Sequence, residues 1–422
     1  MARTIGFTPP ALAEASSGPV RRRHVFYVPG YDPESHKRYR ALFARELSRY
    51  AKRFALWRRI SPATASPDGR VQSWTVEAGG DGWETHTTYE VLLWDDLVRQ
   101  DFRRPLWVTM LLLTAGVLQT TATTQLFRMY RLNWKYGNII LYPFVMTLAL
   151  VLAAGGIGWF VAGLPTGLGP AANAGLGAVA GFAALAAALA ILPHYDHRIF
   201  LRQLINDWVF NWQHSNGWRR DYEERLSWFA DYAAARGRAV GADEVMIIGH
   251  SSGALTAVEV AARLLERTEG SGTALSVLTL GGGLPLVALN PLAQPARAAI
   301  ARLVESDRVV WADYQAPQDW MNFPGFNPAR DLALPPLARI ANPLIRSTKF
   351  RELLDPAVYA KISFRPFRMH FQFLMSNDRP GEYDFFALTL GPQALRDRVL
   401  APQIVPARGD VAAEPASAHR EI

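Results

Sequence analysis

The sequence contains no Asp, Glu, Lys or Arg between Lys135 and Asp196. A surface loop or a half-exposed helix of this length would carry charged residues, so the segment is expected to lie in a membrane. Within it, residues 139–163 and 172–193 each exceed the roughly 20 apolar residues that a helix needs to cross a ~30 Å hydrocarbon core. The Gly- and Pro-rich sequence GLPTGLGP forms the turn between them. The pattern predicts a transmembrane hairpin, and a pair of buried core helices is the alternative.

Positive charges gather at both ends of the predicted hairpin. Its turn has no charge, and the flanking basic residues are Arg128, Arg131 and Lys135 before it and Arg198 and Arg202 after it. Cytoplasmic segments next to membrane helices are enriched in Lys and Arg. We therefore expect a multi-pass protein of a bacterial-type inner (cytoplasmic) membrane, with the rest of the chain and both termini in the cytoplasm.

A third apolar segment, residues 106–127, begins LWVTMLLLTAGVL but continues with the polar sequence QTTATTQ. Three crossings would place the preceding and following parts of the chain on opposite sides of the membrane. A single folded domain made from both parts forbids this. We therefore predict an interfacial helix at the cytoplasmic leaflet, and a full crossing is the alternative.

The rest of the composition narrows the chemistry. The chain has 422 residues, no Cys and a formal net charge of +8. The lack of Cys excludes disulfides, thiolate zinc sites, Fe–S clusters and a cysteine nucleophile. The basic residues are dispersed along residues 36–59 and near the membrane ends, and they form no nucleic-acid-binding motif. We therefore expect an anionic lipid surface as a partner, and no nucleic acid.

Motifs for cofactors and metals do not occur in the sequence. It contains no HExxH and no Walker-type GxxxxGK[ST], and LGGG at residues 280–283 lacks the dinucleotide-binding spacing. The adjacent Asp95 and Asp96 follow a predicted strand, where two acids cap the next helix more often than they hold a metal. The sequence predicts neither a cofactor nor a metal site.

Strand and helix patterns surround the membrane segment, and their alternation after it is typical of a largely parallel sheet. Before the insertion we expect the strand and turn HVFYVPGY, a helix over residues 35–56, and the strands VQSWTVEA and THTTYEVLLW joined at residues 79–82. After it we expect a long helical stretch over residues 199–236, the strand EVMIIG, a helix over 254–267, the strand SVLTLGG, a helix around 295–303, the strand RVVWADY, a final strand KISFRPFRMHFQFL and a helix over 383–390.

These elements predict an α/β fold interrupted by a membrane insertion. We divide the chain into a flexible tail (1–23), a first part of the α/β domain (24–104), the insertion (105–194), a second part (195–400) and a disordered Pro- and Ala-rich tail (401–422). The small-residue sequence AGLGAVAG in the second span has the spacing that lets membrane helices pair, which favours a homodimer through the hairpin.

The sequence Gly249-His250-Ser251-Ser252-Gly253 directly follows the strand EVMIIG and precedes the helix-forming series ALTAVEVAARLLE. A bare GxSxG arises by chance in roughly one chain of this length in seven, so the motif alone is weak. The strand–turn–helix context is the one in which a nucleophilic Ser needs small neighbours and lies at the positive end of a helix dipole. We predict Ser251 as a nucleophile. A structural Ser in a tight turn is the alternative.

A nucleophilic Ser needs a base and an acid, which in this architecture follow it in the order acid, then His. Of the histidines only His370 and His419 lie beyond Ser251, and His419 is close to the end of the chain. His370, which we place at a strand end or in the following loop, is therefore the predicted base. The alternative is a structural His in an aromatic cluster. His250 is expected to point away from the nucleophile.

The acid should follow the strand RVVWADY. Asp319 lies in the loop past this strand, from which its carboxylate can reach the imidazole, whereas Asp313 lies inside the strand and would point into a face. We favour Asp319, with Asp313 as the second choice. For either residue, a turn-forming or capping carboxylate is the structural alternative.

An oxyanion hole takes two preorganised backbone N–H groups. One is expected from Ser252, the residue after the nucleophile. The second should come from the turn Pro29-Gly30-Tyr31. Because Pro29 has no N–H, Tyr31 or Gly30 is the donor.

The sequences HVFYVPGY and VMIIGHSSGAL, with the Asp319 loop and His370, resemble the serine esterases and lipases of the α/β-hydrolase superfamily. The resemblance spans about residues 24–100 and 198–390. It implies a mostly parallel sheet flanked by helices, with the hairpin inserted where a soluble member has a helix crossover. The oxyanion loop departs from the family pattern, which often begins His-Gly, because this chain has Pro29-Gly30.

The resemblance implies a membrane-anchored serine hydrolase that cleaves an acyl ester or related carbonyl of a lipid or other amphiphilic substrate. A catalytically silent hydrolase-fold scaffold that binds a membrane partner is the alternative. A transporter or channel is disfavoured, because two spans without charge offer no polar pathway.

Overall fold

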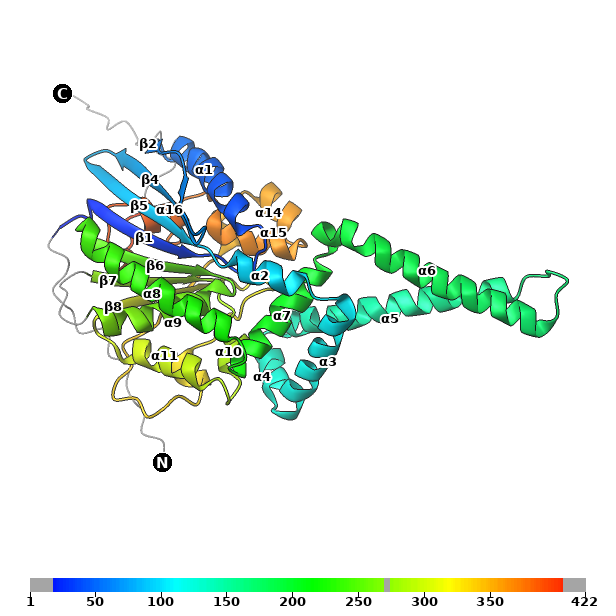
Figure 1. Cartoon of the computed structure of the whole chain (residues 1–422). Coiled ribbons are helices and arrows are strands. Elements are labelled where there is room, and N and C mark those ends of the chain that lie inside the picture. The colour runs from blue at the N-terminus through cyan, green and yellow to red at the C-terminus, as the bar shows by residue number, and fades with distance from the viewer. Residues whose placement is uncertain (1–17, 269–273, 405–422) are drawn as a thin grey trace, which may run out of the picture.

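The computed structural model describes residues 18–268 and 274–404, and within them it contains a nine-stranded mixed sheet (Figure 1). The strands lie in the order β2-β4-β5-β1-β6-β7-β8-β9, and β3 pairs with β4. They are β1 (Arg22–Val28), β2 (Trp57–Ile60), β3 (Thr64–Ala65), β4 (Val71–Gly80), β5 (Trp83–Leu92), β6 (Glu244–His250), β7 (Ala274–Leu280), β8 (Val309–Gln315) and β9 (Leu344–Ser347). Neighbouring strands from β5 to β9 are parallel, and the pairs formed by β4 are antiparallel.

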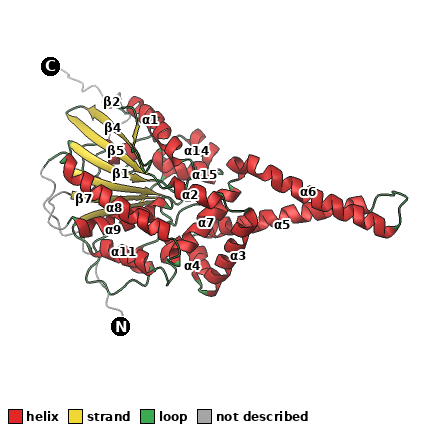
Figure 2. Cartoon of the chain, in the orientation of Figure 1, coloured by secondary structure: helices red, strands yellow, loops and turns green. Residues whose placement is uncertain are grey.

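Helices cover both faces of this sheet (Figure 2). They are α1 (Ser35–Arg53), α2 (Asp95–Phe102), α3 (Leu106–Ala122), α4 (Gln125–Leu132), α5 (Trp134–Ala162), α6 (Pro170–Ile199), α7 (Leu201–Ser215), α8 (Arg220–Val240), α9 (Gly253–Arg267), α10 (Leu284–Ala288), α11 (Gln294–Glu305), α12 (Pro328–Asp331), α13 (Phe350–Leu353), α14 (Pro356–Ile362), α15 (Pro366–His370), α16 (Phe385–Leu390) and α17 (Leu395–Leu400), with a 3-10 turn at Phe371–Leu374.

Alternate residues of each central strand enter two separate cores, as the two-residue period of a strand requires. In β1, Phe26 and Val28 pack with α8, α9 and α11, whereas Val25 and Tyr27 pack with α1 and α16. A sheet that is apolar on both faces must be covered on both. The predicted α/β class is confirmed.

The prediction of a final strand in the segment KISFRPFRMHFQFL is wrong. Residues 361–374 form the end of α14, then α15 and a 3-10 turn, and the ninth strand is instead the short β9. Pro366 occupies the start of α15. Its fixed φ and missing N–H suit the first turn of a helix and disfavour a strand ladder. His370 is therefore the last residue of a helix, and not at a strand end as predicted.

The long helix predicted over residues 199–236 is two helices. The chain breaks at Phe200, whose φ is 53°, and again between α7 and α8, where Gly217 has a φ of 73°. The preceding helix, α6, continues to Ile199 and is longer than the predicted span.

The boundary of the N-terminal tail also differs from the prediction. Arg22 and Arg23 belong to β1, and the buried Arg23 Nε lies 2.8 Å from Glu244 Oε2. The preceding Val20 is only 2% exposed. The rest of the predicted tails, residues 1–17 and 405–422 with His419, lies outside the described residues.

Two helices are long and apolar enough to span a membrane. They are residues 134–162 of α5 and 170–192 of α6, with mean hydropathies of 2.1 and 2.2. They project together from the sheet domain (Figure 1). Trp159 and Phe182 on them are 81% and 75% exposed. An apolar surface of this size marks an interaction site, and on helices of this length the natural environment is lipid.

Small residues hold the two spans against each other. A Cβ added to Gly158 would lie 2.7 Å from Gly177 O, and one added to Gly181 would lie 3.1 Å from Ala154 O. Close helix approach of this kind is what small residues permit in membranes. Because Gly177 and Gly181 of the sequence AGLGAVAG are used within one chain, they do not by themselves favour a homodimer, which stays a prediction.

The segment predicted as an interfacial helix forms α3 and α4, which meet at Thr124 with a φ of 61°. A Cβ added to Gly116 of α3 would lie 2.5 Å from the Trp208 ring of α7, so α3 packs closely on the sheet domain. On α3, Trp107 and Leu118 are exposed by 68% and 66%. Since α2 and α3 together could also form one span bent by 104°, the interfacial placement stays a prediction.

Candidate active site

Ser251 lies in the turn between β6 and α9 with a φ of 60°. This left-handed conformation costs an L-residue roughly 1–2 kcal/mol. Three backbone hydrogen bonds hold it: Ser251 N donates to Leu280 O at 3.1 Å, and Ser251 O accepts from Ala254 N at 3.0 Å and Gly283 N at 3.2 Å. The strained Ser predicted from the GxSxG context is therefore present and held rigidly.

The two glycines of the motif have no room for a side chain. A Cβ added to Gly249 would lie 2.6 Å from the Cα of Ala254, at the start of α9. One added to Gly253 would lie 2.5 Å from the Val28 carbonyl oxygen at the end of β1. The glycines thus allow strand and helix to approach closely enough to form the turn.

His370 and Asp319 form a buried pair. Their Nδ1 and Oδ2 atoms are 2.7 Å apart, and the residues are 2% and 0% exposed. The second carboxylate oxygen, Asp319 Oδ1, accepts from Met321 N at 2.9 Å. Because a carboxylate accepts, the ring carries its proton on Nδ1, which leaves the Nε2 lone pair available as a base.

His370 Nε2 has no hydrogen-bond partner in the part of the chain that the structure describes. Ser251 and His370 line the same cavity, although no hydrogen bond joins Ser251 Oγ to His370 Nε2 among the described residues. Without substrate, catalytic hydrogen bonds are often long and form only in the complex.

Asp313 lies within β8 and forms its hydrogen bonds there and to the neighbouring strand. Its carboxylate accepts from Thr279 Oγ1 and from Gln315 Nε2, both at 2.7 Å, within the sheet. Burial raises the pKa of Asp313, while these hydrogen bonds lower it. Asp319, the favoured acid, therefore lies beside the imidazole of His370, and Asp313, the second choice, does not.

His250 contacts the far side of His370. Its Nε2 lies 3.2 Å from His370 O, and the two ring centroids are 4.5 Å apart. Burial and the nearby His370 lower the pKa of His250, so the ring stays neutral. It supports the segment that carries His370.

The turn Pro29-Gly30-Tyr31 lies beside the nucleophile. A Cβ added to Gly30 would lie 3.5 Å from Ser251 Oγ. Burial raises the pKa of the Tyr39 hydroxyl, and a backbone hydrogen bond from Gly30 to this hydroxyl acts weakly in the opposite direction. Within the described residues the N–H groups of Ser252 and Tyr31 make no hydrogen bond. The N–H groups of Ser252 and Tyr31 are therefore not used by other described groups, whereas that of Gly30 bonds Tyr39. Their role as oxyanion donors stays a prediction.

A cavity of about 720 Å³ opens over these residues. It is lined mainly by apolar and aromatic side chains, and its polar lining comes from Asp32, the nucleophile turn, α1, α7 and α15. Phe200, between α6 and α7, contributes to the wall and stacks on Phe367 with centroids 3.8 Å apart. The cavity therefore lies next to the point where the membrane hairpin joins the sheet domain.

Sequence reasoning missed Asp207 of α7, which lines this cavity. Its only signal in the sequence was an acid within the largely apolar, aromatic-rich series LINDWVFNW. Burial raises the pKa of Asp207 to about 6, although hydrogen bonds from Ser252 and Asn211 and the charge of His370 lower it.

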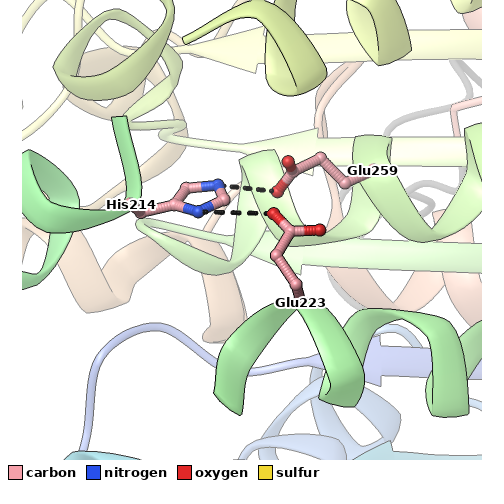
Figure 3. Close-up of side chains that lie close together, drawn as sticks. All are labelled: His214, Glu223 and Glu259. Atoms are coloured by element: carbon pink, nitrogen blue, oxygen red, sulfur yellow. Dashed lines mark hydrogen bonds and ion pairs between the residues drawn. The ribbon is translucent and has the colours of Figure 1, made fainter. Parts of the chain in front are cut away.

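A second cluster of ionisable residues lies away from the cavity (Figure 3). His214 lies between two carboxylates, with Nε2 3.2 Å from Glu259 Oε2 and Nδ1 3.8 Å from Glu223 Oε1. By distance the three groups could hold a metal, since one atom of each lies within 4.8 Å of the others, but each ring nitrogen of His214 lies near a different carboxylate. Arg263 Nη2 also lies 2.6 Å from Glu223 Oε2. The arrangement therefore favours a buried imidazolium over a metal ligand.

The environment of His214 predicts that the free energy of unfolding of the protein depends on pH. Burial alone lowers its pKa, but the charges of Glu259 and Glu223 outweigh this and raise it. A raised folded-state pKa stabilises the protein below the unfolded value of roughly 6.5, and the contribution is lost as pH rises through the folded value. We expect His214→Gln to destabilise the protein by about 3 kcal/mol at pH 6 and by clearly less at pH 9. Thermal unfolding in detergent at both pH values measures this, and an equal loss at both would contradict a charged His214.

Comparisons with protein-family models, with curated proteins and with solved structures give no match to this chain.

Proposed function

We propose that the protein is a membrane-anchored serine hydrolase of the esterase or lipase type that cleaves acyl esters of amphiphilic substrates. The observation that carries the proposal is the buried pair His370–Asp319, 2.7 Å apart, whose His370 lines the same cavity as Ser251 in its strained turn. Strain of this kind persists where the surrounding structure enforces it, and such residues cluster at active sites.

In the proposed mechanism, His370 Nε2 takes the proton of Ser251 Oγ as the oxygen attacks the substrate carbonyl carbon. The resulting imidazolium is stabilised by Asp319, and the tetrahedral oxyanion is bound by the N–H groups of Ser252 and Tyr31. His370 then protonates the leaving alcohol, and an acyl ester on Ser251 remains. Water, deprotonated by the same imidazole, releases the acid and restores the enzyme.

The arrangement of the sheet is compatible with an α/β-hydrolase. The proposed nucleophile follows β6, the acid follows β8, and His370 comes after β9, so the three groups gather at the carboxyl ends of parallel strands. Ligand sites of open α/β sheets lie at these ends. The resemblance of the sequence motifs to that superfamily agrees with this placement.

The hairpin supports an amphiphilic substrate. Phe200, Leu204 and Phe367 line the cavity where the membrane helices meet the sheet domain. An acyl chain leaving a bilayer would find an apolar wall there. We further propose that the sheet domain faces the cytoplasm and that the insertion crosses the membrane twice, as the flanking arginines indicate.

A fluorophosphonate probe tests the proposal, because it reacts with an activated Ser whatever the substrate. We expect the full-length protein in detergent to be labelled and Ser251→Ala to lose all labelling and all hydrolysis of short p-nitrophenyl esters. A Ser252→Ala variant, matched in chemistry and adjacent in sequence, should still be labelled, because its proposed donor is a backbone N–H. Undiminished labelling of Ser251→Ala would refute the assignment, and an unlabelled native protein would favour the silent scaffold.

A further inference from the structure

Asp207 presents an unused acceptor to the cavity. Its Oδ1 accepts from Ser252 Oγ at 2.7 Å and from Asn211 Nδ2 at 3.1 Å. No hydrogen bond within residues 18–268 and 274–404 reaches its Oδ2, and this atom is not among the buried atoms that lack a partner. Because Asp207 is surrounded by protein and lines the cavity, its Oδ2 is accessible there.

A second acceptor lies one helical turn away on the same face of α7. The side-chain amide of Gln203 donates through Nε2 to Tyr31 O. This bond does not use the amide oxygen Oε1, which is an acceptor. Gln203 and Asp207 both line the cavity, together with Leu204 of the same helix and with Phe200, which directly precedes the helix. The wall beside Ser251 therefore offers hydrogen-bond acceptors next to an apolar surface.

The charges around the cavity decide which donor suits these acceptors. Three guanidinium groups, of Arg38, Arg45 and Arg368, also line it. Asp32 lines it as well and is paired with Arg38 at 2.9 Å, and Arg45 is paired with Glu46 at 2.9 Å, whereas no carboxylate forms an ion pair with Arg368 in the described part of the chain. An ammonium group would meet the charge of Arg368, and an anion next to Ser251 would meet Asp207. A neutral hydroxyl group suits both sides.

The position of Asp207 next to Ser252 places such a hydroxyl near the scissile ester. The carboxyl, whose pKa burial raises to about 6, exists in both protonation states near neutral pH. It can accept from a hydroxyl group when ionised and donate to one when protonated.

We propose that Asp207 binds a hydroxyl group on the alcohol part of the substrate, so that the preferred substrates are partial esters of polyols, such as monoacyl esters of glycerol. The inference rests on the proposed hydrolase function. In it, the acyl chain lies along Phe200, Leu204 and Phe367, and a free hydroxyl next to the ester bonds Asp207 Oδ2.

The test compares two esters of the same acid, glycerol monodecanoate and propyl decanoate, with the full-length protein in detergent. We expect the native protein to favour the glycerol ester in kcat/KM by at least about tenfold, since a lost bond to a buried charged group costs this much. In Asp207→Ala the preference should fall below about threefold, through the glycerol ester alone. Asp231→Ala makes the same change on the exposed surface of α8, where the side chain is 67% exposed, and should keep the preference.

Labelling of Ser251 by the fluorophosphonate separates the outcomes. A labelled native protein that shows no preference between the esters overturns the role of Asp207 and leaves the hydrolase intact. An equal loss on both esters in Asp207→Ala also overturns it, because Asp207 would then act by holding Ser252. Asp207→Asn is the second variant if Asp207→Ala folds poorly. It keeps the shape and an oxygen toward Ser252 and Asn211, and it turns an NH₂ toward the cavity, so it should retain part of the preference by donating to the substrate hydroxyl. An unlabelled native protein overturns the hydrolase assignment and this inference with it.

Discussion

Asp319→Asn is expected to lower kcat for acyl esters by roughly 1,000- to 10,000-fold. The reason lies in the second hydrogen bond of this residue. Asp319 Oδ1 accepts from Met321 N, so an Asn in the same place would keep its oxygen there and turn its NH₂ toward His370. The ring nitrogen Nδ1 would then have to accept, and the proton would move to Nε2. A histidine in this tautomer cannot take the proton of Ser251.

Asp313→Asn is the matched control, since it makes the same chemical change in the preceding strand. Asp313 bonds Thr279 and Gln315 and does not contact His370, so kcat should stay within about threefold of the native value. Steady-state kinetics on short esters, with thermal unfolding to confirm that both variants fold, measure the difference. The reverse ranking would transfer the role of the acid to Asp313.

Both residues show how much of the site the sequence could determine. The order of Ser, acid and His along the chain, with few histidines to choose from, was enough to predict His370. A loop position was enough to favour Asp319, because a side chain beyond a strand can reach across the sheet edge whereas Asp313 is fixed within the ladder. These predictions needed only chain order and local geometry, and the structure brings the two residues together.

The helix that carries His370 had a local signal, because Pro366 suits the first turn of a helix and disfavours a strand ladder. Other features depend on contacts that no local pattern encodes. Asp207 reaches the cavity because α7 crosses beside the nucleophile turn, 45 residues away along the chain. The strand β9 has four residues, too few for a period to emerge from the sequence. The wall of the cavity that α7 forms therefore could not be predicted from the sequence, because it depends on long-range packing.

The membrane topology predicts a result that is all or none, because a given site lies either on one side of the membrane or on the other. Gly30 lies before the insertion and Ser251 after it, yet a Cβ on Gly30 would be 3.5 Å from Ser251 Oγ. Two segments that meet in one soluble domain must lie on the same side of the membrane. We therefore expect an even number of crossings between them, and α5 and α6 are the two helices long and apolar enough to supply these.

A reporter that is active only outside the cytoplasmic membrane should accordingly be active when fused between Pro165 and Pro170, and silent when fused at Pro105 or at residue 197. Single Cys residues at these positions, tested with a membrane-impermeant thiol reagent, give an independent measurement, since the native chain has no Cys to interfere. Opposite sidedness at 105 and 197 would make α3 a third crossing. The turn of Gly30 could then not meet Ser251 in one compartment, and the proposed oxyanion hole would fail together with the topology.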